Sequence, residues 1–313
     1  MLACALGHRV RSHFSGGIHW FRVGAWDART LGEMLAVRFG TPRDRRSLFP
    51  ALRQHLSKER PAFIVLDNHE DDRAMARFLD ELRGAHVTWV ITARRCLLSG
   101  VSIFPVTAPL VTAGKVAFPR VAPLTALLRH NPLALDIADA LVSSRATRVA
   151  PLRAFLLDHG VDRVRAVSHE DDLPEVTLLV AWAWQRLDRR ARRLLAVLAY
   201  VSGDHTGQDS LMALAQVGRP GIRALRLLLR WHLVQEPFLG RFVLHAVVRF
   251  AIRRRVKIDE RRIFEHYLAL LEHHPERFDL EQTHLFAAMD FAHSSSNLGQ
   301  ALRIERLLRA LPF

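Results

Sequence analysis

The sequence is poor in cysteine and has no long apolar run. Cys4 and Cys96 are its only cysteines among 313 residues, too few for a disulfide framework or a thiolate zinc site, and this scarcity fits a reducing compartment. No uncharged apolar run approaches the ~20 residues that a membrane-spanning helix needs. The N-terminal segment has too short an apolar core for a secretory signal peptide. We therefore expect a cytoplasmic protein without membrane attachment.

Lysine is scarce as well. It occurs only at Lys58, Lys115 and Lys257, although the formal net charge is +14, so nearly every cation is arginine. Such a skew is typical of a GC-rich genome and needs no polyanionic partner to explain it. Nucleic-acid binding must therefore be argued from the placement of the arginines, because the total charge alone does not indicate it.

A glycine-rich phosphate loop ending in Lys and Ser or Thr is missing too, yet two segments are typical of a phosphate-handling sheet. One apolar run covers residues 63–67 and ends in Asp67, and a second covers residues 87–94 and contains Thr92 and Arg94. Short apolar runs of this kind predict strands buried on both faces of a parallel sheet, whose ligands gather at the carboxyl ends of the strands. Asp67 would supply an acid for a metal ion and Arg94 a cation for a phosphate. The alternative for Asp67 is a residue that only caps the next turn.

Alternating strand and helix patterns up to about residue 122 predict an α/β domain with a parallel sheet in three layers. Thr30 and Asp72 are expected helix caps, and a weak strand is expected at 101–106. Helical periodicity then dominates, with a first helix at 123–142, and a β-hairpin is expected at 233–244. We divide the chain into an α/β domain (1–122), a helical subdomain (123–172), a winged-helix subdomain (173–256) and the start of a helical repeat (257–313).

Two shorter motifs accompany this pattern. Pro132 opens a helix in His-Asn-Pro-Leu-Ala-Leu, and Pro in the first turn suits a helix structurally. His245 lies where the hairpin meets the next helix, and a lone His beside an apolar run is more often a core or capping group than a ligand.

Taken in order, these segments resemble the nucleotide-binding module of the STAND NTPases, the NB-ARC-like switch ATPases. The resemblance covers nearly all of residues 1–256. The matching segments are the helix start at 1–3, the strand at 14–24, the Walker B strand at 63–67, the sensor at 92–94, the Pro motif at 130–135 and the His motif at 244–246.

The resemblance implies a regulatory switch that binds ADP or ATP with Mg²⁺ and signals by nucleotide-gated oligomerisation. Asp67 would then hold Mg²⁺, Thr92 and Arg94 would sense the phosphate, Pro132 would lie against adenine and His245 would contact the β-phosphate of ADP. The C-terminal helices would bind protein partners.

Departures from the family qualify these roles. The Walker A loop is absent, and Asn68 replaces the second acid that often follows Walker B. We therefore expect weak or absent nucleotide binding, no robust ATPase activity, and a truncated or degenerate module. The first expected helix is already under way at Met1, which favours truncation over degeneration.

A stripe of arginines supports an alternative function. Residues spaced i, i+4, i+7 and i+11 fall on one helical face, in the segment that reads DNA in a winged helix. Such a face would match DNA phosphates, as in a transcriptional regulator. We prefer the alternatives, a solvated surface or a surface that docks onto the acidic region 67–72. A third alternative is a catalytically dead adaptor that binds proteins. The stripe consists of Arg219, Arg223, Arg226 and Arg230.

Overall fold

The computed structural model describes residues 2–44, 46–58, 60–93, 95–106, 118–160, 173–201, 205–295 and 297–310. It divides into two compact units, which are described separately. Unit 1 comprises Met1–Phe104 and Tyr267–Phe313, and unit 2 comprises Pro105–His266. The four-part division expected from the sequence stays a prediction.

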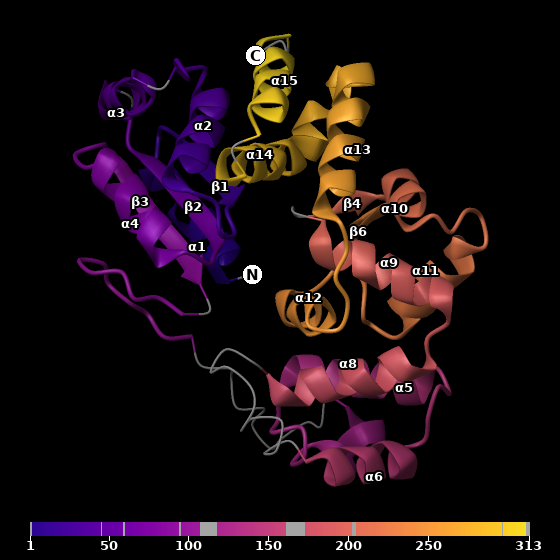
Figure 1. The fold of residues 1–313 in the computed structure, drawn as a ribbon. Helices are drawn as coiled ribbons and strands as arrows, with labels where there is room; N and C mark the ends of the chain where they lie inside the picture. Colours follow the sequence, from indigo (N-terminus) through magenta and orange to yellow (C-terminus); the bar gives the residue numbers. More distant parts are fainter. Residues whose placement is uncertain are drawn as a thin grey trace. The chain divides into compact units, whose positions relative to one another are not determined.

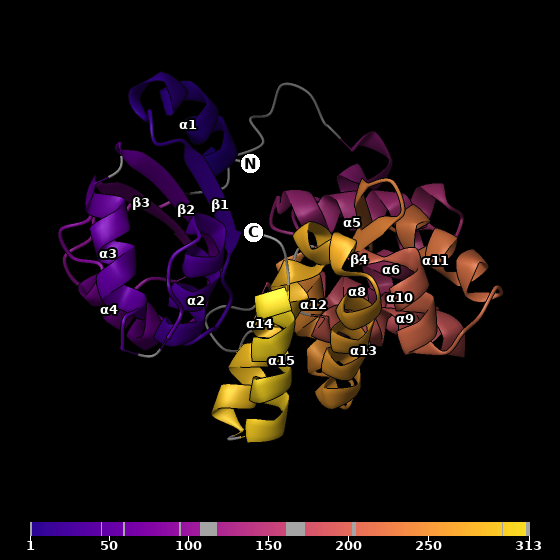
Figure 2. The ribbon, with the colours of Figure 1, turned by 90° about the horizontal axis from the view of Figure 1, so that it is seen from above.

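Unit 1 contains a parallel three-stranded sheet with the strand order β1-β2-β3 (Figure 1). Consecutive strands are joined by helical crossovers, as a parallel sheet requires. Figure 2 shows α2, α3 and α4 on one side of this sheet and α1 on the other. The elements are α1 (Leu2–Val10), η1 (Arg11–His13), β1 (Ile18–Arg22), α2 (Ala28–Phe39), α3 (Leu48–Lys58), β2 (Ala62–His69), α4 (Asp72–Glu81), β3 (Val87–Ala93), η3 (Pro275–Arg277), α14 (Phe278–Ser294) and α15 (Leu298–Ala310), with the second part of α13 (Glu260–His273).

The central strand β2 forms the core of this sheet. Residues 62–66 are all buried, because β2 is paired on both edges and covered on both faces. The prediction that the run at 87–94 is likewise buried on both faces is wrong. Among the described residues β3 pairs only with β2, and its side chains are half-buried or exposed. An apolar composition marks a strand but does not show whether it lies at the edge of a sheet.

Side-chain hydrogen bonds explain where α2 and α4 begin, and they show that the predicted caps Thr30 and Asp72 are wrong. Helix α2 begins after Asp27, whose carboxylate accepts a hydrogen bond from the backbone N–H of Thr30 at 2.7 Å. Asp71 rather than Asp72 caps α4 and accepts from the backbone N–H groups of Arg73 and Ala74. In each case the carboxylate one residue before the first helical turn satisfies N–H groups that the helix leaves unpaired.

The C-terminal helices of unit 1 pack on its N-terminal part. The ring centroids of Trp26, just before α2, and Phe286, on α14, lie 6.3 Å apart. The Asp290 carboxylate accepts a hydrogen bond from the backbone N–H of Asp27 at 2.8 Å. Residues far apart in the sequence therefore share one core in unit 1.

Unit 2 is mainly helical and has one small antiparallel sheet of order β4-β6-β5. The hairpin expected at 233–244 is present as β5 and β6. The expected helix at 123–142 is interrupted, because Arg129 and His130 have positive φ angles and Asn131 starts a new helix. No strand is found at 101–106. The elements are η2 (Pro119–Leu124), α5 (Pro132–Ser143), α6 (Val149–His159), α8 (Pro174–Arg186), α9 (Arg189–Tyr200), β4 (Thr206–Gly207), α10 (Gln208–Ala215), α11 (Gly221–Arg230), β5 (Gln235–Phe238), β6 (Arg241–Val243), α12 (Ala246–Arg253) and the first part of α13.

The core of unit 2 lies around α12, which contacts both α8 and α9. Trp182 on α8 is only 1% exposed, and its ring lies 6.5 Å from that of Trp231, just after α11. The Tyr200 hydroxyl at the end of α9 donates a hydrogen bond to the Val256 carbonyl at 3.0 Å. These contacts fix the segment that follows α12 against α9.

Candidate functional site

The carboxyl edge of the unit 1 sheet brings Asp67 and Thr92 together. The Thr92 hydroxyl donates a hydrogen bond to Asp67 Oδ1 at 2.5 Å. The backbone N–H of Asn68 donates to the same hydroxyl oxygen at 2.9 Å. Thr92 is therefore held from two sides, and one Asp67 oxygen is oriented by it. Because parallel strands end at one edge, the sequence predicted this proximity.

A kink in β2 follows Asp67. Asn68 has a φ of +60°, a left-handed conformation that Asn tolerates better than most residues. The register with β3 shifts between Leu66 and His69. His69 then turns inward, is 4% exposed, and its Nε2 lies 2.7 Å from Asp72 Oδ1. The kink thus separates an acid at the sheet edge from the pair of buried His69 and half-buried Asp72, which anchors the start of α4.

The structure does not test whether the other predicted site residues meet this edge. Arg94 lies outside the described residues. Pro132 and His245 belong to unit 2. Their roles in holding a nucleotide therefore stay predictions.

Pro132 and His245 each have a structural role in unit 2. Pro132 occupies the first turn of α5, where the Asn131 side chain accepts a hydrogen bond from the backbone N–H of Ala134 at 3.1 Å. His245 precedes α12, and its Nδ1 accepts from the backbone N–H of Val247 at 3.4 Å. Both residues thus start helices, which is the structural alternative that the sequence left open.

The arginine stripe lies on α11 and the turn before it. All four side chains are exposed, whereas Ala224, Leu225 and Leu228 of the same helix are buried. The predicted amphipathic face is therefore present. The four arginines are Arg219, Arg223, Arg226 and Arg230.

Among the described residues, no group of three or more His, Cys, Asp and Glu side chains is arranged to hold a metal ion. Within the same residues no helix is long and apolar enough to cross a bilayer. A Mg²⁺ ion at Asp67 would therefore need ligands from the nucleotide and from water in addition to this carboxylate.

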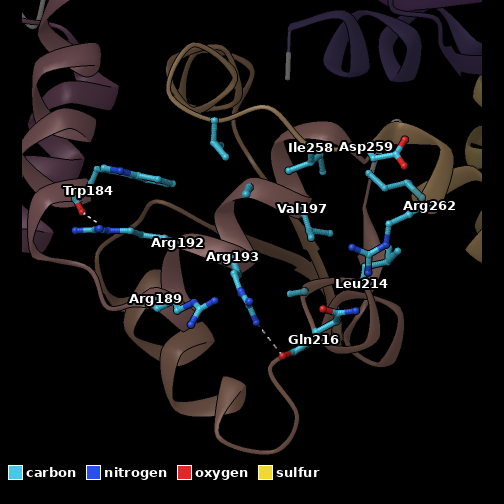
Figure 3. A pocket seen from close by; sticks show the side chains of 14 residues that line it. Trp184, Arg189, Arg192, Arg193, Val197, Leu214, Gln216, Ile258, Asp259 and Arg262 are labelled. Carbon is cyan, nitrogen blue, oxygen red and sulfur yellow. Dashed lines mark hydrogen bonds between the residues drawn. The ribbon is translucent and has the colours of Figure 1, made fainter.

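One group of charged residues in unit 2 was missed by the sequence interpretation. Four arginines line a cavity beside α9 (Figure 3). The available signal was the pair of arginine doublets on either side of Ala191, which the arginine-rich composition concealed. The four residues are Arg189, Arg192, Arg193 and Arg262.

Comparisons with known proteins give matches among solved structures alone. No family model matches the chain, and no curated protein matches it. One of the solved structures that match is the crystal structure of a Signal Transduction ATPase with Numerous Domains (STAND) protein with a tetratricopeptide repeat sensor from Pyrococcus horikoshii. The superposition covers 93% of this chain and 52% of that chain, at 15% sequence identity and a TM-score of 0.41. The chain thus spans about half the length of that protein. At this TM-score the likeness establishes no shared fold.

Proposed function

We propose that the chain is a regulatory module of the STAND type that binds ADP or ATP weakly, with Mg²⁺, at the carboxyl edge of the unit 1 sheet. The observation that carries the proposal is the hydrogen bond between Thr92 and Asp67 at the ends of neighbouring parallel strands. An oriented carboxylate at this place suits a Mg²⁺ ion bound directly or through water.

The residues fit the nucleotide only in part. Asp67 supplies a metal ligand, and Thr92 supplies a hydroxyl that fixes its orientation. The sequence has no Gly-rich loop with Lys to surround the β- and γ-phosphates, so most of the usual phosphate contacts are missing. Asn68 cannot act as a second acid. Weak binding and ATP hydrolysis at the background rate follow from these absences.

The rest of the proposal concerns unit 2 and the C-terminal helices. Helices α9, α10 and α11, followed by the β5–β6 hairpin, support a winged-helix subdomain within 173–256. Helices α13, α14 and α15 support a helical segment that binds partners or a second copy of the chain. Helix α14 already contacts α2 within unit 1, so a partner would have to use the faces that this packing leaves exposed.

Nucleotide binding is tested by ligand-observed NMR, which detects dissociation constants near 1 mM. With about 5 mM ADP and Mg²⁺, we expect saturation transfer to the adenine protons that weakens when Mg²⁺ is chelated. Asp67→Asn should abolish the Mg²⁺-dependent part, because the amide is a poor metal ligand. The exposed Asp80→Asn serves as a control with the same change of charge and should leave the signal intact. Absence of transfer to the unmodified chain would overturn the proposal.

The exposed face of α11 supports one alternative, a DNA-binding regulator. Four guanidinium groups on one helical face can contact phosphates, and each contact releases counterions. Under this alternative, replacing all four arginines by Gln lowers affinity for duplex DNA about 10-fold or more and reduces the salt slope by about four. Fluorescence anisotropy at several salt concentrations measures both quantities. A duplex affinity that does not depend on the salt concentration, or that the four substitutions leave unchanged, contradicts the alternative.

A further inference from the structure

A cavity of about 400 Å³ lies within unit 2. It is formed by the end of α8, one face of α9, the end of α10, the segment that connects α12 to α13 and the first turn of α13. The hydrogen bond from Tyr200 to Val256 holds that connecting segment against α9. The size lies within the range that small-molecule sites occupy.

The floor of the cavity is apolar. Val197 and Ile263 are 6% and 2% exposed and close its inner end, and Figure 3 shows Leu214 and Ile258 beside Val197. Trp184 adds an aromatic ring at one side. An apolar body placed here would leave water and contact these side chains, which is a favourable transfer.

The rim of the cavity is strongly positive. Its charged residues are four arginines and one acid, Asp259, and Asp259 accepts a hydrogen bond from the backbone N–H of Arg261 at 3.0 Å. In the described part of the chain, no salt bridge joins any of the four arginines to a carboxylate. They are Arg189, Arg192, Arg193 and Arg262.

Two of these arginines are fixed by neutral acceptors. Arg192 donates from Nε to the Trp184 carbonyl at 2.9 Å and from Nη2 to the Gln185 carbonyl at 3.1 Å. Arg193 donates from Nη1 to the Gln216 carbonyl at 3.5 Å. A carbonyl orients a guanidinium group but does not neutralise its charge. Arg189 and Arg262 are exposed at the rim, where their guanidinium groups can reach an anion.

We propose that this cavity binds a small organic anion that combines a carboxylate with a flat apolar body. The apolar body lies on Val197, Leu214 and Ile258, and the carboxylate meets either Arg189 or Arg262, which Figure 3 shows on opposite sides of the cavity. Guanidinium groups form planar paired hydrogen bonds with carboxylates. The proposal assigns unit 2 a ligand of its own and does not depend on nucleotide binding at Asp67.

The test compares naphthalene-2-carboxylate with its neutral analogue 2-naphthalenemethanol by isothermal titration calorimetry. We expect the carboxylate to bind about 10-fold more tightly, because a hydrogen bond between two charged groups is stronger than one to a neutral hydroxyl. The double variant R189Q/R262Q should remove this preference and leave the affinity for the alcohol unchanged. Arg190→Gln is the matched control, because Arg190 is exposed on the same helix and does not line the cavity.

Three outcomes would overturn the proposal. The first is equal affinity for the carboxylate and the alcohol, or no binding of either at about 1 mM. The second is an equal loss in the Arg190→Gln control, which would indicate a general charge effect. The third is displacement of the carboxylate by equimolar inorganic phosphate, which would show that the apolar floor contributes nothing. Since Arg189 and Arg262 are exposed, their replacement leaves the fold intact, and circular dichroism verifies this.

Discussion

Replacing Phe78 by Ala is expected to lower the free energy of unfolding of unit 1 by about 3–5 kcal/mol. Phe78 lies on α4 and is 0% exposed. Its ring lies 5.5 Å from that of Trp89 on β3 and 6.5 Å from that of Phe49 on α3, edge-on in both cases. The substitution removes contacts with both elements and leaves a cavity between the helices and the sheet.

Urea denaturation followed by tryptophan fluorescence and by hydrogen exchange of the β2 amides measures this loss. Phe78→Leu keeps most of the volume and should cost less than about 1.5 kcal/mol. Arg77→Ala, an exposed position on the same helix, should leave the midpoint nearly unchanged. A loss below about 1 kcal/mol for Phe78→Ala would show that the three rings do not form a joint core.

Replacing Asp290 by Asn is expected to stabilise unit 1 at pH 8 by about 1–2 kcal/mol, allowing for solvent screening of this partly exposed group. The pKa of Asp290 is raised from 3.8 to about 6, mainly because the carboxyl is buried; the nearby Asp27 and Asp71 carboxylates contribute to the rise, and the hydrogen bond from the Asp27 N–H opposes it. An Asn side chain keeps the oxygen that accepts from Asp27 and removes the buried charge.

The direction of the pH dependence follows from this raised pKa. Between pH 3.8 and about 6 the folded chain holds a proton that the unfolded chain releases. The stabilisation that the protonated Asp290 carboxyl provides is therefore complete below pH 3.8 and is lost as the pH rises through about 6. Urea midpoints at pH 5 and pH 8 should differ for the unmodified chain, and the Asn variant should reduce the difference. Glu81→Gln, an exposed position, is the control, and a variant less stable at pH 8 would contradict the expectation.

The sequence predicted the part of the site that depends on strand ends. Asp67 and Thr92 each end an apolar run, and the parallel arrangement of these runs alone brings the two side chains within hydrogen-bonding distance. The same pattern did not reveal that β3 is an edge strand among the described residues, because central strands and edge strands can both have an apolar composition.

The hydrophobic pattern of the sequence could not predict contacts between segments that are far apart in the chain. Asp27 and Asp290 are 263 residues apart and share one hydrogen bond, and no local periodicity indicates such a partner. Asp290 lies within an otherwise apolar stretch of α14, so an acid at that position was the available signal. The cavity beside α9 is a similar case, because Val256 and Ile258 reach it only through the packing of the segment after α12.

The open side of β3 has a consequence for the behaviour of the chain in solution. Val87–Ala93 is apolar, rich in β-branched residues and without charge, and backbone groups along one of its sides lack a strand partner among the described residues. Such an edge is a template on which another strand can add. Solubility at high concentration will therefore depend on what covers this edge, and a charged residue introduced at the exposed Thr88 is a direct means of blocking unwanted strand addition.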